Sequence, residues 1–203
     1  MTATFLRFFV VILIVGAAAT VILRFIPMKH TEMRCIAPDT ADQVQRLITE
    51  YDIGPLHVQG HATVPGRVAD IFPHLIDIDL MKKWMPELQS GAYDGVAKWE
   101  DIQPGEIRKL SFGAQADVER ILLMDAPFHF AYQIIGGIKI DRHLAFMTVR
   151  QKTPGQTTFS WFQFFEAQGV KGRFQKWQVR RFVRSGVAGF ANEFKGAAIE
   201  SCH

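Results

Sequence analysis

The residues with the clearest capacity for chemistry are Glu119 and His143. They lie in the runs VERILLMD and DRHLAFMTV, which are otherwise mostly apolar. A carboxylate in an apolar cavity has a raised pKa, so Glu119 could act as an acid or base, or orient a polar group of a ligand. The alternative for Glu119 is an ion pair with Arg108 or Lys109 on a neighbouring strand. His143 could be a general base, or a hydrogen-bonded residue of the wall.

Other polar residues give weaker signals. Asp77 and Asp79 lie near a predicted helix start, where capping is favoured over metal binding. Cys35 and Cys202 are near opposite ends of the chain, neither has a partner at metal-ligand spacing, and the sequence leaves open whether they pair. No glycine-rich phosphate loop, nucleophile elbow or metal cluster appears. We therefore expect no metal and no cofactor.

The segment from Gly105 to Phe165 predicts consecutive antiparallel strands. Each run alternates two kinds of side chain and is rich in β-branched and aromatic residues, as half-buried strands are. Turns are expected at Gly113, at Asp125 to Pro127, at Gly136 and Gly137, and at Pro154 and Gly155. The runs are GEIRKLSFG, QADVERILLMD, HFAYQIIGGI, DRHLAFMTV and TTFSWFQFF.

Shorter elements precede this meander. DTADQVQRLITEY predicts an amphipathic helix behind an Asp39/Thr40 cap, lying either on the domain or on a bilayer surface. HVQGHATV reads as a first strand. Two short helices, about 66–72 and 77–85, are expected to be separated at Pro73. AYDGVAKWED, with Trp99, is expected to form the second strand.

A long final helix is predicted over about 172–199. Its basic face has three interpretations: a solvated surface, contact with anionic lipid headgroups, or nucleic-acid binding, the last without any recognition motif. That face carries Lys176, Arg180, Arg181 and Arg184. The apolar stripe, expected to close over the sheet, consists of Val179, Val183, Val187, Phe190, Phe194 and Ala197.

The order strand, two short helices, six strands and long helix resembles the helix-grip fold of the START/Bet v 1-like (SRPBCC) superfamily, in particular its polyketide cyclase/dehydrase-like and lipid-transport branch. The resemblance covers about residues 57–200. It implies an α+β fold with a curved antiparallel sheet wrapped on the C-terminal helix. Pro73 and the strongly basic final helix depart from the pattern. The motifs that carry it are Val64-Pro65, Trp84 to Pro86, GEIRKLSFG, VERILLMD, FAYQIIGG and Thr158 to Trp161.

The resemblance also implies a ligand site. In the family pattern the Glu of the Glu-Arg pair faces inward, which carried over places Asp117, Glu119, Ile121 and Leu123 on the cavity face. The inward face is then an aromatic-lined pocket with a few polar groups, typical of a site for an apolar small molecule. The expected ligand-binding residues are Arg108, Leu110, Phe112, Glu119, Ile121, Tyr132, Ile134, His143, Met147, Phe159, Trp161, Gln163 and Phe190.

The N-terminal run FLRFFVVILIVGAAATVILRFI predicts a single-pass membrane anchor. With its flanks it offers about 20 apolar residues, enough to cross a bilayer core of roughly 30 Å. The alternatives are a signal peptide cleaved near Ala17 to Ala19, or a buried core helix. One basic residue, Arg7, lies near the start of the run. Arg24, Lys29 and Arg34 end or follow it, so the positive-inside rule favours a cytoplasmic C-terminal domain.

Size and composition set the remaining bounds. The chain has 203 residues, 48% of them hydrophobic, which argues against a disordered protein. A net charge of +3 implies no polyelectrolyte partner, and nucleic acid is not expected. We expect an anchor over 1–26, a tether with a short helix over 27–55, and a helix-grip domain over 56–203.

Two functions fit these features best. The first is a membrane-anchored binding or transfer domain for a hydrophobic small molecule such as a lipid, a quinone or a polyketide-like compound. The alternative is a cyclase or dehydratase in which Glu119 and His143 transfer protons. A third possibility is an interaction module with a filled core. The sequence does not name the ligand or the oligomeric state.

Overall fold

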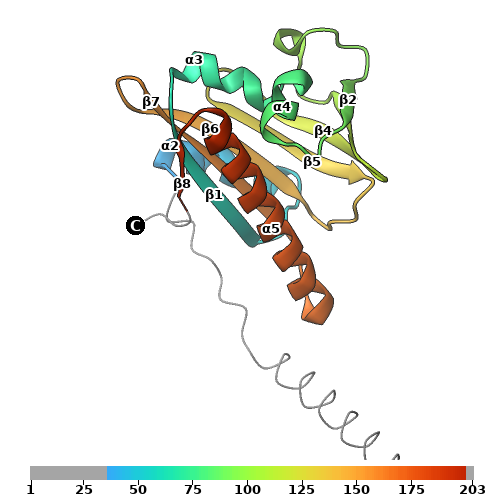
Figure 1. Cartoon of the computed structure of the whole chain (residues 1–203). Helices are drawn as coiled ribbons and strands as arrows, with labels where there is room; N and C mark the ends of the chain where they lie inside the picture. The colour runs from blue at the N-terminus through green and yellow to red at the C-terminus, as the bar shows by residue number, and fades with distance from the viewer. Residues whose placement is uncertain (1–35, 200–203) are drawn as a thin grey trace, which may run out of the picture.

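The computed structural model describes residues 36–199, and its main element is an eight-stranded antiparallel sheet in the order β2-β3-β4-β5-β6-β7-β1-β8 (Figure 1). The α+β architecture with a long C-terminal helix is as predicted. The strands are β1 (Leu56–Pro65), β2 (Ser90–Tyr93), β3 (Ile107–Phe112), β4 (Gln115–Asp125), β5 (His129–Gly136), β6 (Leu144–Thr153), β7 (Gln156–Phe165) and β8 (Ala197–Ile199). The helices are α2 (Pro38–Glu50), α3 (Val68–Ile71), η1 (Phe72–Leu75), α4 (Ile78–Trp84), η2 (Trp99–Asp101) and α5 (Gly169–Glu193).

The two faces of the sheet are covered by different helices. Figure 1 shows α5 running diagonally across one face, with α3 and α4 at one end of that layer. This side holds the larger core, to which Trp84, Trp161 and Phe190 belong. On the opposite face, Val44 and Leu47 of α2 pack with apolar residues of β4 to β7 in a second cluster. The amphipathic helix therefore lies on the domain, which decides between the two predicted positions.

Polar contacts fix α2 to the sheet. Its start differs from the prediction, because the helix begins at Pro38 with Ala37 in the cap position and no side-chain cap bond. The Thr40 hydroxyl lies 3.3 Å from His129 Nε2 and accepts a 2.8 Å bond from Arg150 Nη2. His129 Nδ1 in turn bonds the Asp125 carboxylate at 2.8 Å. Thr40 thus joins α2 to β5 and β6 instead of capping the helix.

The predicted helix pair is present and is divided as Pro73 requires. Pro73 stands at the start of η1, where its missing N–H costs no helical bond. The second helix, α4, is capped by Asp77, whose Oδ1 accepts bonds from the backbone N–H groups of Asp79 and Leu80. The prediction that Asp77 caps a helix is confirmed.

Two elements differ from the sequence prediction. The second strand was expected over 92–101, but β2 ends at Tyr93, Gly95 takes a φ of +78°, and Trp99 begins η2. The final helix ends at Glu193, so Ala197 does not lie on it. Lys195 has a φ of +53°, and the chain then turns so that β8 pairs with β1 at His61 to Thr63.

A bulge in β4 changes which side chains face inward. The register with β5 shifts between Ile121 and Leu123, so the alternation is interrupted there. Ile121 packs in the core under α5, whereas Leu123 packs with the cluster under α2. The prediction that Leu123 faces the cavity was therefore wrong.

Glycines allow α5 to lie close to its neighbours. A Cβ on Gly60 of β1 would lie 2.9 Å from a methyl of Val187 and 3.0 Å from one of Val183. A Cβ on Gly189 would lie 2.1 Å from the carbonyl oxygen of Trp84. Both contacts are too short for a real side chain, so glycine is required where α5 crosses β1 and the end of α4.

The predicted anchor, residues 1–26, lies outside the described residues, as do Cys35 and Cys202 and the first part of the tether. Between residues 36 and 199, no helix combines the length and apolar character needed to cross a bilayer.

Candidate ligand-binding site

A cavity of about 500 Å³ lies between the sheet and α5. Its floor is the inward face of β3 to β7, and its other walls come from α4, α5 and the loop after β5. Pockets for small molecules commonly have volumes of about 300–1,000 Å³. Eight predicted ligand-binding residues line it: Arg108, Leu110, Phe112, Glu119, Tyr132, Ile134, Met147 and Gln163.

The other predicted site residues lie elsewhere. Ile121 belongs to the core, and His143 lies behind the cavity wall. The three aromatic ones gather around Trp84, where the Phe159 and Phe190 ring centroids are 4.2 Å apart and those of Trp84 and Trp161 are 6.1 Å apart. This cluster fills the space between α4, β7 and α5. Those aromatic residues therefore hold the helix onto the sheet.

Sequence reasoning missed a second group of cavity residues. They come from α4, from the loop after β5 and from the cavity side of α5, where strand alternation gives no information. A moderately apolar loop and a helix flank carry no distinctive pattern, so only the folded arrangement reveals them. The group includes Met81, Met85, Ile138, Ile140, Gln175, Gln178 and Phe182.

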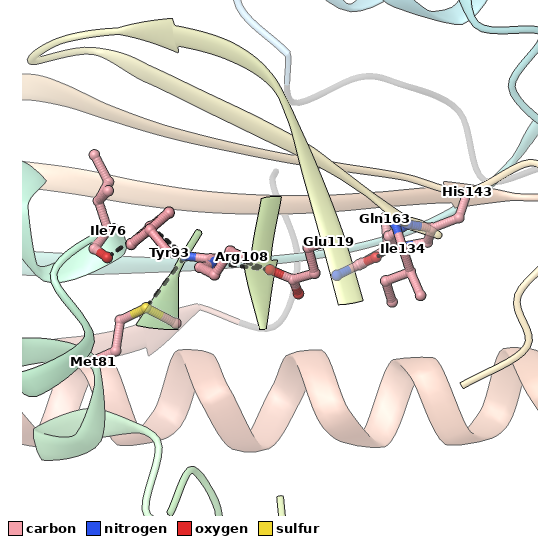
Figure 2. A network of polar contacts seen from close by, with 8 residues as sticks. All are labelled: Ile76, Met81, Tyr93, Arg108, Glu119, Ile134, His143 and Gln163. Carbon is pink, nitrogen blue, oxygen red and sulfur yellow. Dashed lines mark hydrogen bonds and ion pairs between the residues drawn. The ribbon is translucent and has the colours of Figure 1, made fainter. Parts of the chain in front are cut away.

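The polar centre of the cavity is an ion pair between Arg108 and Glu119. These residues are directly opposite each other on β3 and β4, and both are almost fully buried. Arg108 Nε and Nη2 donate to the same carboxylate oxygen, Glu119 Oε2, at 2.7 and 2.6 Å (Figure 2). The ion pair with Arg108, one of the two alternatives for Glu119, is present, but it does not remove Glu119 from the cavity wall.

Aromatic and polar groups surround the Arg108 guanidinium. Its Nη1 donates to the Tyr93 hydroxyl at 3.2 Å and to Met81 Sδ at 3.4 Å. The Tyr93 hydroxyl donates onward to the Ile76 carbonyl at 2.9 Å. The rings of Phe130 and Tyr132 each have their centroid 5.0 Å from the guanidinium carbon, close enough for cation–π attraction. Arg108 is therefore compensated on every side, as a buried charge must be.

The pKa values of the pair show two opposed effects. Burial disfavours the charge of Arg108, but the Glu119 carboxylate outweighs this and the pKa of Arg108 is raised. Burial also raises the pKa of Glu119, and the guanidinium opposes that rise. We hold that the pair is ionised at neutral pH, because Arg108, whose pKa is raised, stays charged, and a buried charge needs an ionised partner. The pKa of Tyr132 is raised well above its ordinary value by burial, so its hydroxyl stays protonated.

His143 orients Gln163. It precedes β6, and its Nδ1 accepts the backbone N–H of Ile134 at 3.0 Å while its Nε2 lies 2.5 Å from Gln163 Oε1 (Figure 2). Burial lowers the pKa of His143 to about 4, so the ring is neutral at pH 7. Because Nδ1 accepts, the proton is on Nε2, and Gln163 must present its oxygen to the ring. The amide NH₂ of Gln163 is thereby turned away from His143, and one of its N–H groups donates to the Tyr132 hydroxyl.

The strand register places three polar groups in a row on the cavity floor. Tyr132 pairs with Ala145, and Ala145 pairs with Gln163, so Tyr132 and Gln163 share one line across β5, β6 and β7. Glu119 lies two residues from Ile121, the partner of Tyr132. Within the described residues, Glu119 Oε1 has no hydrogen-bond donor and is not sealed off. The floor thus offers an acceptor, a hydroxyl and a donor.

The arrangement does not bring the two predicted proton carriers to one contact point. Glu119 lines the cavity, but His143 reaches it only through Gln163. The cyclase or dehydratase mechanism with these two residues stays a prediction. In the part of the chain that the structure describes, no group of three His, Cys, Asp or Glu side chains could hold a metal ion.

The sequence matches the family described as polyketide cyclase / dehydrase and lipid transport over residues 55–195, and the chain belongs to that family. This is the SRPBCC-type class that its sequence motifs resemble, and the family description points to hydrophobic small molecules as ligands. None of the curated proteins compared with the chain matches it.

Solved structures with the same fold are distant in sequence. The protein XoxI from Bacillus cereus is 12% identical, with a TM-score of 0.57, over 68% of this chain and 95% of its own. A protein from Thermobifida fusca is 19% identical, with a TM-score of 0.57, over 68% and 93%. DynU16, from the dynemicin biosynthetic locus, is 11% identical, with a TM-score of 0.54, over 68% and 47%. At these identities the likeness establishes the fold alone.

Proposed function

We propose that this protein binds, and passes on, a hydrophobic small molecule held between the sheet and α5. The observation that carries the proposal is the cavity of about 500 Å³, whose wall combines apolar side chains with a few fixed polar groups. A lipid, a quinone or a polyketide-like compound has the required apolar body. Membership of a family that includes lipid-transport proteins supports the same function.

The polar row on the floor defines the end of the ligand that would enter first. Glu119 Oε1 can only accept a hydrogen bond, because Arg108 keeps the carboxylate ionised. The Gln163 amide offers its second N–H as a donor, since His143 occupies its oxygen and Tyr132 accepts from the other N–H. A ligand that places a hydroxyl on Glu119 and a carbonyl or ether oxygen near Gln163 would satisfy both. The carboxylate of an acidic ligand would be repelled by the Glu119 carboxylate, which carries the same charge.

We also propose that the first 26 residues anchor the domain in a membrane, with the domain on the cytoplasmic side. The support is the apolar run of the sequence and the basic residues that follow it. Protease digestion of sealed vesicles tests the orientation. Cleavage of the domain from the cytoplasmic face alone is the expected result, and cleavage from the opposite face alone would place the domain outside.

Native mass spectrometry of the full chain, extracted in mild detergent, tests the binding function. The expected spectrum contains a complex whose extra mass matches an apolar compound, and that compound should bind again after it has been stripped. A chain that carries no small molecule, and takes none up from a total lipid extract, would rule the function out.

A further inference from the structure

The outward face of α5 carries an apolar stripe that no described residue covers. Val170, Phe174 and Trp177 follow one another at helical spacing and are 47%, 58% and 53% exposed. The Phe174 and Trp177 rings stack with centroids 5.8 Å apart and planes at 23°, and the Arg181 guanidinium carbon lies 5.8 Å from the Trp177 centroid. Large aromatic side chains this exposed on a helix indicate a binding surface.

The charge of the same helix is strongly one-sided. Its sequence contains six basic residues and one acidic residue, Glu193, which is the last residue of the helix. All the basic residues come before Ser185, on the part of the helix that carries the apolar stripe. They are Lys171, Arg173, Lys176, Arg180, Arg181 and Arg184. The complementary partner is an anionic surface with an apolar layer beneath it.

The position of the stripe relates it to the cavity. Figure 1 shows the first turns of α5 projecting beyond the sheet, away from the end where α3 lies. Gln175 of this part donates to the Lys139 carbonyl at 2.9 Å, and both residues line the cavity together with Ile138 and Phe182. Ile138 and Phe182 are 37% and 38% exposed. The stripe therefore borders the opening through which the cavity meets solvent.

We propose that this face of α5 docks onto an anionic lipid bilayer. Phe174 and Trp177 enter the interfacial layer, where amphipathic aromatic rings are favoured, and the basic side chains reach the phosphates around them. Each basic residue near an anionic membrane adds a modest attraction, and several together hold a helix in place. A bilayer matches both the stripe and the charge, whereas nucleic acid matches the charge alone. Docking also turns the cavity opening toward the lipid.

Trp177 provides the measurement. The full chain is reconstituted in vesicles of phosphatidylcholine alone or mixed with phosphatidylglycerol, in each case with and without bromine on the acyl chains, which quenches nearby tryptophan. The other three tryptophans are the background, which the Trp177→Phe chain measures: Trp84 and Trp161 are fully buried, and Trp99 is partly buried against the core. We expect Trp177 to be quenched in the mixed vesicles, and this component to disappear in Trp177→Phe. A merely tethered domain would leave Trp177 as bright as in unbrominated lipid.

Two matched controls make the outcome specific. Phe128 is 46% exposed at the start of β5, the opposite end of that strand from the cavity opening, so a tryptophan there in the Trp177→Phe chain should not be quenched. Lys171→Gln with Arg180→Gln should reduce quenching in the mixed vesicles. Arg67→Gln with Lys152→Gln, the same charge change at the start of α3 and the end of β6, should not. Equal quenching with and without phosphatidylglycerol would overturn the anionic requirement. If the chain still binds its ligand but Trp177 is not quenched, the docking proposal is overturned and the proposed binding function is not.

Discussion

At the scale of single residues, the cavity depends on the Arg108–Glu119 ion pair, which stabilises the fold and still leaves one carboxylate oxygen for a ligand. Arg108 uses one oxygen of Glu119 and is otherwise held by Tyr93 and aromatic rings. The second oxygen remains for a ligand. Such a pair is costly to break, because removing one partner leaves the other as an unpaired buried charge.

Replacing Arg108 with Met should therefore destabilise the domain strongly. We expect a loss of about 3–5 kcal/mol in the free energy of unfolding, measured by urea denaturation of the purified chain. The double variant Arg108→Met with Glu119→Leu should recover most of that loss, because no buried charge remains. A double variant as unstable as the single one would show that Arg108 acts through packing.

Replacing Glu119 with Gln should weaken ligand binding. Because it also leaves the buried Arg108 guanidinium without its counter-charge, binding is compared at a temperature where circular dichroism shows the variant to be folded. A hydrogen bond to a charged acceptor contributes about 1–1.5 kcal/mol more than one to a neutral amide oxygen, so we expect roughly a five- to tenfold rise in Kd. The measurement is titration with the compound identified by mass spectrometry. Glu106→Gln, a carboxylate near β3 but outside the cavity wall, should leave Kd unchanged.

His143 should make stability depend on pH. Its pKa is lowered from 6.5 to about 4 by burial, so the unfolded chain binds more protons between these values. Stability is thus fully present above pH 6.5 and is lost as the pH falls toward 4, by roughly 3 kcal/mol in total. Subtracting the unfolding free energy of His143→Gln at each pH isolates this contribution. A difference that does not change with pH would contradict the buried neutral ring.

At the scale of elements, the sequence predicted the strands better than the connections between them. Alternation identified β3 to β7 because each strand has one face on a core. Alternation could not predict the bulge in β4, which turns the Leu123 side chain to the opposite face of the sheet. A bulge inserts one extra residue, and here no residue type in the sequence indicates it. The helical spacing continues to Ala197 and predicts helix there, whereas pairing with β1 makes this segment the strand β8.

The contact between α5 and α4 should be sensitive to a single methyl group. Gly189→Ala normally favours a helix, but here the new Cβ would meet the Trp84 carbonyl oxygen, which cannot move away. We expect a loss of roughly 2 kcal/mol in the free energy of unfolding, from thermal or chemical denaturation. The exposed neighbour Ala188→Gly should cost about 1 kcal/mol from helix propensity alone. A stabilised Gly189→Ala would mean that α5 lies farther from α4.

At the scale of the whole molecule, residues that line the cavity and residues of the filled core should respond differently to the same substitution. Val179 lines the cavity, whereas Val183, one turn later, is fully buried in the core against Gly60. Val179→Phe should fill empty space, so the melting temperature is kept while the co-purified ligand is lost. Val183→Phe should lower the melting temperature, because overpacking a filled core costs about 1–3 kcal/mol. Similar effects of both variants on melting would argue against an empty cavity.

The candidate site was only partly predictable for a related reason. Strand alternation supplied the floor, including Arg108, Glu119 and Tyr132. It could not separate a cavity wall from a filled core, because Trp161 and Phe159 face the same side of the sheet and are instead packed against Trp84. Where α5 lies along the sheet decides which inward residues meet empty space, and that position depends on the glycines.

The short strand after α5 has a consequence for how copies of this protein meet. Among the described strands, β7 pairs with one side of β1, and on the other side β8 pairs with His61 to Thr63 alone. An unpaired strand edge is a template for addition of a strand from another chain. The last described residues therefore act as a cover against self-association. A truncation after α5 would leave the pocket residues in place but open β1 to domain swapping and aggregation.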